Sequence, residues 1–564
     1  MHVATTVLLL LFITTLSLPL ARVVRIPLPL LQIVLGVGAG LAGIHVSFEP
    51  DVFLLLFIPP LLFADAYLMP MREFLALKRV ILMLALGLVL FTTIGCGYFI
   101  HWLIPSVPLA ACFALAAVLS PTDAVAVAGM LEGRQVPRRF MHILSGEALL
   151  NDASGLVCFK FAVAAAVTGS FSFGNAVGSF VLMSCIGLLA GVVLAAAMSL
   201  MIRVLNWRGL DDAVAFITVS ALLPFAAYLA AEHLGGSGIL AAVSAGLTLK
   251  QMRAFNVTSS ETRLTGAAIW NVLTFCFNGL IFLLLGLQLP ALIRGGLSLV
   301  RAAGVPAWRL LLTIVLITLA LVLLRFVWVS ASLLLQQVVR HVQKALPGKP
   351  PRTRTMPSAR LVVAMSVAGV RGAITLAAVL SLAPDFPDRD LLVTLAAGVI
   401  MASLVLAASM LPGLLNGLVM PDVDPMQAEA DRARLTIAQK AVEAVERELE
   451  LPDEDTYSEE REAMVSSVLA SLKVRELRLR EALDPNSLED DDDERRLRLR
   501  HDRLETAFRL RILRVERDAL IKMSRSADIN DETERALARE LDHQEEVLSA
   551  VARSLPRHIR EDVA

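Results

Sequence analysis

Apolar stretches long enough to cross a lipid bilayer recur through the first three quarters of this chain. A membrane-spanning helix needs about 20 mostly apolar residues. Thirteen stretches approach or exceed that length, at residues 3–21, 27–44, 51–69, 80–104, 108–131, 140–168, 174–203, 211–232, 237–250, 266–290, 309–338, 359–383 and 389–419. The ninth, which follows Gly235-Gly236, is short and gives the weakest signal. The sequence therefore predicts an all-α membrane protein with about 13 transmembrane helices.

The composition changes sharply near residue 420. The 564 residues are 56% hydrophobic, with a mean hydropathy of +0.68, which is beyond the range of a soluble domain. Residues 425–564 are instead dominated by Arg, Glu, Asp and Leu. We therefore expect a transmembrane domain over 1–420 and a cytoplasmic helical domain over 425–564. That domain could regulate the first, pair in a dimer or bind a partner.

Leucine and alanine spacing predicts helices in the domain over 425–564. Thr456 with Glu459 and Asp531 with Glu534 look like capping boxes at the starts of such helices. The acidic run 489–494 is typical of a solvated linker or helix start. The expected helices are 428–451, 459–482, 492–524 and 532–554.

Basic residues in the loops predict how the chain is oriented. Loops after odd-numbered stretches carry 19 Lys and Arg residues, and loops after even-numbered stretches carry 4. Because short cytoplasmic loops are enriched in Lys and Arg, the N-terminus is expected outside and the tail in the cytoplasm. The first stretch is long and lacks a basic region before it, so we expect a retained helix and not a cleaved signal.

Several function classes lack their signatures. The chain has no GxxxxGK[ST] motif for binding ATP, no CxxC pair among its five cysteines, and no HxxH or HExxH spacing among its nine histidines. We therefore expect no enzyme activity, no cofactor and no nucleic-acid partner. If the protein moves a solute, an existing gradient must drive the movement.

A proline and a carboxylate interrupt the fifth stretch, in the run Ser120-Pro121-Thr122-Asp123. Proline removes a backbone donor and disrupts the preceding turn. A charge at membrane depth costs roughly 3 kcal/mol or more, so it is kept where it faces a partner or a wet cavity. The run predicts a helix broken at mid-membrane, with Thr122 and Asp123 facing a cation. The alternative is a proline kink whose Asp123 bonds to a neighbouring helix.

The sixth stretch carries Glu147, Asn151 and Asp152. Asp152 can hold either a proton or a cation, which is the minimum device for exchange, and Asn151 offers an uncharged oxygen beside it. Glu147 lies five residues earlier, about 140° around a helix. It therefore faces another side and is expected to have a structural role.

Arg371 lies between Gly369 and Gly372 in the twelfth stretch. Glycine permits unwinding, and a buried guanidinium needs a carboxylate. We expect Glu147 to be that partner. The fifth and twelfth stretches run in opposite directions, and two broken helices in matching positions are typical of an inverted-repeat transporter.

Other polar residues in the stretches allow two interpretations. Asp65 is either a carboxylate of the ion pathway or an interface residue. Lys160 either acts as a fixed counter-charge in the core or extends outward, and Arg325 is equally ambiguous. Asn278-Gly279 and Ser237-Gly238 favour helix packing over ligand binding.

Five motifs in order resemble the monovalent cation/proton antiporter-1 family, which includes NhaP-type and NHE-type sodium/proton exchangers. They cover residues 1 to about 420 and read PPLLFADAY, SPTDAVAV, GEALLNDASGLV, SGILAAVSAG and AGVRGAITLAAVLSL. The resemblance implies thirteen helices, core and dimerisation domains, a homodimer and elevator-like alternating access. It implies that Asp152 is the cation and proton carboxylate, that Thr122 and Asp123 line a broken helix, and that Glu147 and Arg371 form an ion pair.

The resemblance also implies the stoichiometry, because an Asn-Asp pair in place of Asp-Asp implies one-for-one electroneutral exchange. Two departures affect selectivity. Ala148 replaces a serine found in NhaP-type relatives, and Asn278 replaces a glutamate of animal exchangers.

The predicted function is therefore antiport of Na⁺, or alternatively K⁺ or Li⁺, against H⁺ across a bacterial inner membrane, with lipid as a partner. The alternatives to an antiporter are a cation channel and a transporter-like sensor. The predicted cation site consists of Asp152, Asn151, Thr122, Asp123 and Asp65.

Overall fold

The computed structural model describes residues 2–416, with short gaps at 25, 45–49, 132–133, 135, 170–172, 211, 253–259, 303, 305 and 345–357, and separate residues between 435 and 548. The chain divides into two compact units, Met1–Leu418 and Val419–Ala564. This division falls close to the change in composition.

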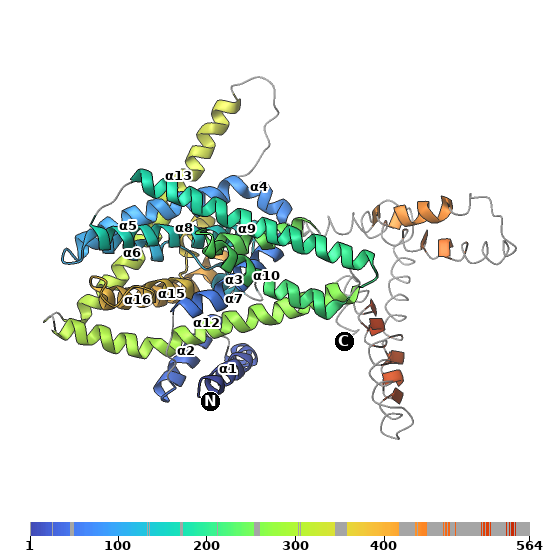
Figure 1. Ribbon diagram of the computed structural model, residues 1–564, viewed down its shortest axis with the longest axis horizontal. Helices are drawn as coiled ribbons and strands as arrows, with labels where there is room; N and C mark the ends of the chain where they lie inside the picture. The colour runs from blue at the N-terminus through green and yellow to red at the C-terminus, as the bar shows by residue number, and fades with distance from the viewer. Residues whose placement is uncertain are drawn as a thin grey trace. The chain divides into compact units, whose positions relative to one another are not determined.

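The described part of the first unit is helical, and all thirteen apolar stretches coincide with a helix or with consecutive helical segments (Figure 1). The segments are α1 (His2–Val24), α2 (Leu28–Leu41), α3 (Pro50–Leu68), α4 (Met71–Leu82), the π-helical η1 (Met83–Leu88), α5 (Val89–Leu103), α6 (Leu109–Leu119), α7 (Ala124–Met130), α8 (Arg138–Thr168), α9 (Phe173–Trp207), α10 (Ala213–His233), α11 (Gly238–Gln251), α12 (Ser260–Ala302), α13 (Ala307–Lys344), α14 (Ala359–Val367), α15 (Ala373–Leu380) and α16 (Arg389–Leu415).

Length and apolar composition identify this unit as an integral membrane domain. Among the described residues, eight helices can cross a membrane, and a ninth crossing is added if α6 and α7, which bend by 47° at their break, count as one span. The number of thirteen crossings remains a prediction.

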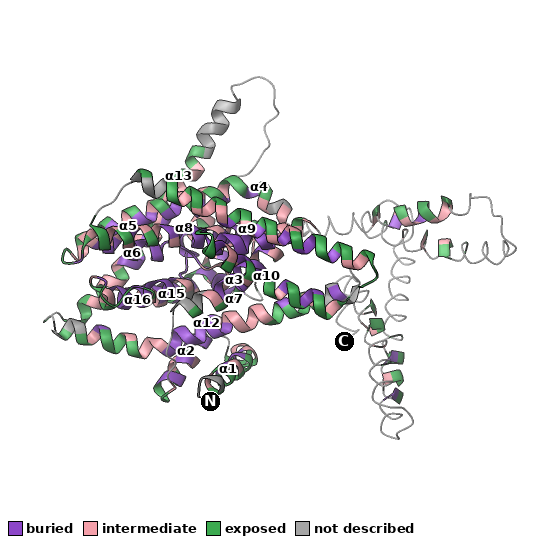
Figure 2. Ribbon diagram, in the orientation of Figure 1, coloured by how far each residue is buried: buried purple, intermediate pink, exposed green. Residues whose placement is uncertain are grey.

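In Figure 2 the buried residues gather in the interior of the first unit and the exposed ones lie on its outer helices. Many of the exposed side chains are large and apolar, as a lipid-facing surface requires. Trp102, Trp207 and Trp308 are largely exposed, and each lies at or next to a helix end. Tryptophan is enriched at membrane–water interfaces. These three side chains therefore fit the levels of the two lipid headgroup layers.

Glycines allow close helix packing inside the domain. Gly36 of α2 and Gly286 of α12 face each other so closely that a Cβ on either would overlap the other helix's backbone carbonyl. Lipid is as apolar as a leucine side chain, so membrane helices associate through such close contact and not through the hydrophobic effect.

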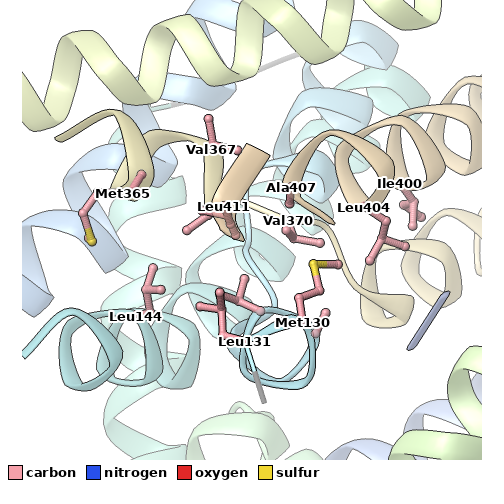
Figure 3. Packing of buried hydrophobic residues seen from close by; sticks show 14 of the residues in the cluster. Met130, Leu131, Leu144, Met365, Val367, Val370, Ile400, Leu404, Ala407 and Leu411 are labelled. Atoms are coloured by element: carbon pink, nitrogen blue, oxygen red, sulfur yellow. The ribbon is translucent and has the colours of Figure 1, made fainter. Parts of the chain in front are cut away.

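One apolar cluster surrounds the two broken spans (Figure 3). Met130 and Leu131 at the end of α7 meet Leu144 of α8 and Val370 between α14 and α15. Side chains of α16 pack on the same cluster, among them Ile400, Leu404, Ala407 and Leu411. This packing holds both breaks inside the protein.

The second unit contains helical segments that lie within the four helices expected from sequence. Residues 438–447 are helical, and Ala438, Val442, Leu513 and Leu520 are buried. Two ion pairs join consecutive predicted helices, Lys473 with Glu446 at 2.8 Å and Arg517 with Glu545 at 2.6 Å. The capping-box residues and the acidic run 489–494 lie outside the described residues.

Candidate functional site

The two interrupted spans meet at their breaks. The α6–α7 span is interrupted at residues 120–123, and the α14–α15 span at residues 368–372. The backbone N–H of Asp123 donates to the carbonyl of Val370 at 2.7 Å. Backbone groups freed by one break are thus partly satisfied by the other, which is how irregular backbone is tolerated at membrane depth.

Asp123 restarts the first broken span. Its Oδ1 accepts from the backbone N–H groups of Val125 and Ala126, both at 2.9 Å, so it is the N-cap of α7. Asp residues are favoured at this position because they satisfy free helix donors. Its other carboxylate oxygen lies against Gly372, where an added Cβ would stand 2.5 Å from it.

Glu147 forms a two-point ion pair with Arg325. One guanidinium nitrogen of Arg325 donates to Glu147 Oε1, and the other donates to Oε2 at 2.6 Å. Both side chains are about 99% buried. The structural role predicted for Glu147 fits this geometry, because it does not line the cavity described below.

The prediction that Arg371 pairs with Glu147 is wrong, because Arg325 occupies that place. Arg371 instead donates from Nε to the Leu119 carbonyl at 2.7 Å, and from Nη1 to the Gly369 carbonyl. Breaking two helices leaves carbonyls without helical donors, and Arg371 satisfies one at each break. It therefore joins the breaks, while Arg325 neutralises the carboxylate.

A chain of polar side chains continues from this ion pair. The Thr122 hydroxyl donates to Glu147 Oε1 at 3.3 Å and accepts from Asn151 Nδ2 at 2.9 Å. Asn151 Oδ1 is buried without a partner in the described structure. Asn151 is not among the cavity-lining residues. The structure thus places it behind the cavity, in contact with Thr122.

Four of the five predicted site residues line one cavity of about 320 Å³. Asp65 enters it from α3, Asp152 from α8, and Thr122 and Asp123 from the break between α6 and α7. Further lining residues include His142, Ser145, Ala148, Asn278 and Thr375. Three carboxyl groups and several neutral oxygens in one apolar enclosure can hold a cation or protons.

The ambiguous residues divide by position. Asn278 lines the cavity, whereas Gly279 packs on α1, where a Cβ would overlap Thr14. Ser237 caps α11, accepting from Leu240 N–H at 3.4 Å. Lys160 is exposed on α8, so it does not neutralise a core carboxylate. Among the described residues, no group of three or more His, Cys, Asp or Glu side chains is arranged to hold a bound metal ion as a resident cofactor.

Sequence reasoning left two residues without a role, Arg325 and His142. Arg325 lies in an apolar run 16 residues from Arg309, and that isolation predicts a buried partner as strongly as the setting of Arg371 does. His142 also lines the cavity, three residues before Ser145 on α8, which lines it too. Its helical spacing with Ser145 could have indicated this.

The fold has counterparts among solved structures. The sodium proton antiporter MjNhaP1 from Methanocaldococcus jannaschii matches with a TM-score of 0.56 and 17% identity, covering 74% of this chain and 99% of that one. This likeness is one of fold.

Sequence comparison identifies relatives. An uncharacterized Na(+)/H(+) exchanger, YjcE of Escherichia coli (strain K12), is 42% identical over 97% of this chain and 99% of its own. A sodium, potassium, lithium and rubidium/H(+) antiporter of Bacillus subtilis (strain 168) is 36% identical over 91% of this chain and 73% of its own. The family model described as "Sodium/hydrogen exchanger, transmembrane" matches residues 7–417. This chain therefore belongs to the sodium/hydrogen exchanger family of membrane cation/proton antiporters.

Proposed function

We propose that this antiporter exchanges one monovalent cation for one proton at Asp152. One observation carries the proposal: Asp152, Asp123, Asp65 and Thr122 converge on a single cavity at the point where the two broken spans meet. A carboxylate that holds either a proton or a cation couples their opposite movements.

The neighbouring groups have different tasks in this exchange. Asp123 has one oxygen committed to capping α7 and the other beside Gly372, so it shapes the site and adds negative charge. Asp65 supplies a carboxylate from α3. Asp152 accepts no hydrogen bond from the described residues, which leaves it available to the transported ion.

Alternating access is proposed to move the broken spans together. The Asp123–Val370 bond and the contacts of Arg371 connect α6–α7 to α14–α15, so these spans can shift as one body, as in an elevator. Asp65 and Asn278 come from α3 and α12 and line the same cavity. We assign the latter helices to a dimerisation domain of a homodimer.

We further propose that the cavity faces the cytoplasm. Its lining includes Met69 and Pro70 beyond the end of α3, and His142 in the second turn of α8. Both ends adjoin the basic segments 72–79 and 134–139, which we assign to the inside of the cell from the distribution of charges. On the same argument, the N-terminus lies outside and Val419–Ala564 lies in the cytoplasm of a cell whose plasma membrane holds the domain.

The transported cation is proposed to be Na⁺, with K⁺ or Li⁺ as alternatives. Ala148, one turn before Asp152, lines the cavity without offering an oxygen, and Asn278 offers an uncharged one. The Bacillus relative's name includes four alkali cations. Flux measurements with Na⁺, K⁺, Li⁺ and Rb⁺ at several pH values rank them directly.

The central test is Asp152→Asn in purified protein reconstituted into liposomes. Asparagine is nearly isosteric but cannot ionise, so cation-driven proton flux should vanish while thermal stability stays close to that of the wild type. The matched control is Asp390→Asn, because the Asp390 side chain is 73% exposed, and its flux should equal that of the wild type. Ion-driven proton flux by Asp152→Asn would disprove the assignment.

The same liposomes separate the alternatives. An exchanger shows saturable counter-flow of cation and proton. A channel would pass cations without a proton gradient, and a sensor would give no flux in the wild type.

A further inference from the structure

A six-residue π-helical segment lies between the two helices that carry the buried ion pair. This segment, η1, interrupts the long span formed by α4 and α5. A π turn inserts an extra residue and shifts backbone carbonyls out of the α-helical pattern, and such segments are frequent at functional sites. No residue of η1 lines the cavity, so the exchange described above gives it no role.

Two carbonyls of this span receive side-chain donors from different helices. The Ser154 hydroxyl, on α8, donates to the Ala85 carbonyl at 2.6 Å. Trp328 Nε1, on α13, donates to the Met83 carbonyl at 3.2 Å. Both acceptors belong to η1, and they are two residues apart.

These donors lie close in sequence to Asp152 and Arg325. Ser154 follows Asp152 by two residues, and Trp328 follows Arg325 by three, or about one helical turn. Each bond therefore fixes the depth and rotation of a helix close to the level of its charged residue.

The packing around η1 leaves little freedom for adjustment. A Cβ on Gly87 would overlap the Trp328 ring. A Cβ on Gly146, the neighbour of Glu147, would stand 2.5 Å from Ile81 Cδ1. Leu84, Ala85 and Leu88 are buried. The span thus fits closely against both α8 and α13.

We propose that η1 is a fixed reference for the transport site, with Ser154 and Trp328 as its positioning residues. Ser154 sets the position of Asp152 through α8, and Trp328 sets that of Arg325 through α13. The inference rests on the proposed role of Asp152. Binding geometry must be held within about 0.5 Å to be effective, so loss of either bond should weaken cation binding before it affects folding.

The test compares Ser154→Ala with the wild type in liposomes loaded for Na⁺-driven proton flux. A neutral hydrogen bond of ordinary strength corresponds to about threefold to tenfold in an equilibrium constant. We expect the KM for Na⁺ to rise by that factor with the maximal rate within about twofold. The pH of half-maximal exchange at fixed Na⁺ should shift too, because proton and cation compete for one carboxylate.

Three further variants make the result specific. Ser154→Thr keeps the hydroxyl and should restore the wild-type KM. Trp328→Phe should act in the same direction, and its combination with Ser154→Ala should change KM by less than the product of the single effects, because both bonds hold one segment. Ser184→Ala removes a buried hydroxyl that has no partner in the described structure and should change nothing.

An unchanged KM and pH profile in Ser154→Ala would overturn the proposal, as would a loss of maximal rate and thermal stability with KM unaltered. If Asp152→Asn shows no cation-driven proton flux while Ser154→Ala resembles the wild type, only the positioning role fails. If Asp152→Asn still exchanges, the transport site itself is misassigned.

Discussion

Glu147 and Arg325 are 178 positions apart in the chain, yet their side chains form a two-point ion pair inside the protein. Breaking a buried pair leaves an uncompensated charge, which costs about 3–5 kcal/mol. We therefore expect Glu147→Ala and Arg325→Ala each to lower the thermal stability of purified protein in detergent. The double variant Glu147→Gln with Arg325→Met should recover part of that loss.

A thermodynamic cycle identifies the true partner. The stability losses of Glu147→Ala and Arg325→Ala should be strongly non-additive, because the two groups touch. Glu147→Ala combined with Arg371→Ala should show weaker coupling, since Arg371 bonds to carbonyls. Stronger coupling to Arg371 than to Arg325 would contradict the observed pairing.

The sequence indicates which residues need partners but not which partners they take. Asp123, Asp152, Glu147, Arg325 and Arg371 all stand out because charges are rare in apolar spans. Choosing between two arginines requires the helix positions, which depend on contacts far apart in the chain. The orientation of Lys160 depends likewise on the rotation of α8, and the structure shows it exposed.

At the scale of helices, the fit between the two breaks depends on Gly372. Its backbone angles, φ −101° and ψ −174°, are open to any residue, so its small size and not its flexibility is what the site uses. A methyl group added at Gly372 would overlap the Asp123 carboxylate. Overpacking of a close contact typically costs about 1–3 kcal/mol.

We expect Gly372→Ala to separate the breaks and to lower the maximal exchange rate at least tenfold in liposomes. The control is Gly38→Ala on α2, where an added Cβ meets nothing within 4 Å, and its rate should match the wild type. Equal rates for both variants would show that the contact between the breaks is dispensable.

Helix breaks were predictable because Pro121 and the glycines around Arg371 act locally on the backbone. The π-helical η1 was not, because its run MLALGL has the composition of an ordinary apolar helix. Its extra residue is stabilised by Ser154 and Trp328, and such long-range donors leave no local pattern.

At the scale of the molecule, the proposed transport site lies entirely within Met1–Leu418. The family model ends at residue 417, and 74% of this chain matches 99% of the MjNhaP1 structure. The fold therefore occurs in a protein without most of the tail. The change in composition near residue 420 lies close to the boundary between the two compact units, while the cytoplasmic domain over 425–564 stays a prediction.

Charge balance is a property of the whole transport cycle. In the proposed exchange Asp152 alternates between one proton and one monovalent cation, Asn151 adds no charge, and Glu147 is neutralised by Arg325. Lys160 was a candidate counter-charge, but it is exposed and does not enter the balance. The loaded site then carries the same charge in both directions.

We therefore expect the exchange rate to be independent of voltage. Moving one net charge through 100 mV changes the free energy by about 2.3 kcal/mol, so a charge-moving cycle would respond strongly. The measurement is Na⁺-driven proton flux in liposomes, with and without a potential clamped by K⁺ and valinomycin. A rate that follows the potential would mean that a second proton is carried. Asp65 and Asp123, the other carboxylates in the cavity, would then be its candidate carriers, and Asp65→Asn or Asp123→Asn should abolish the voltage response.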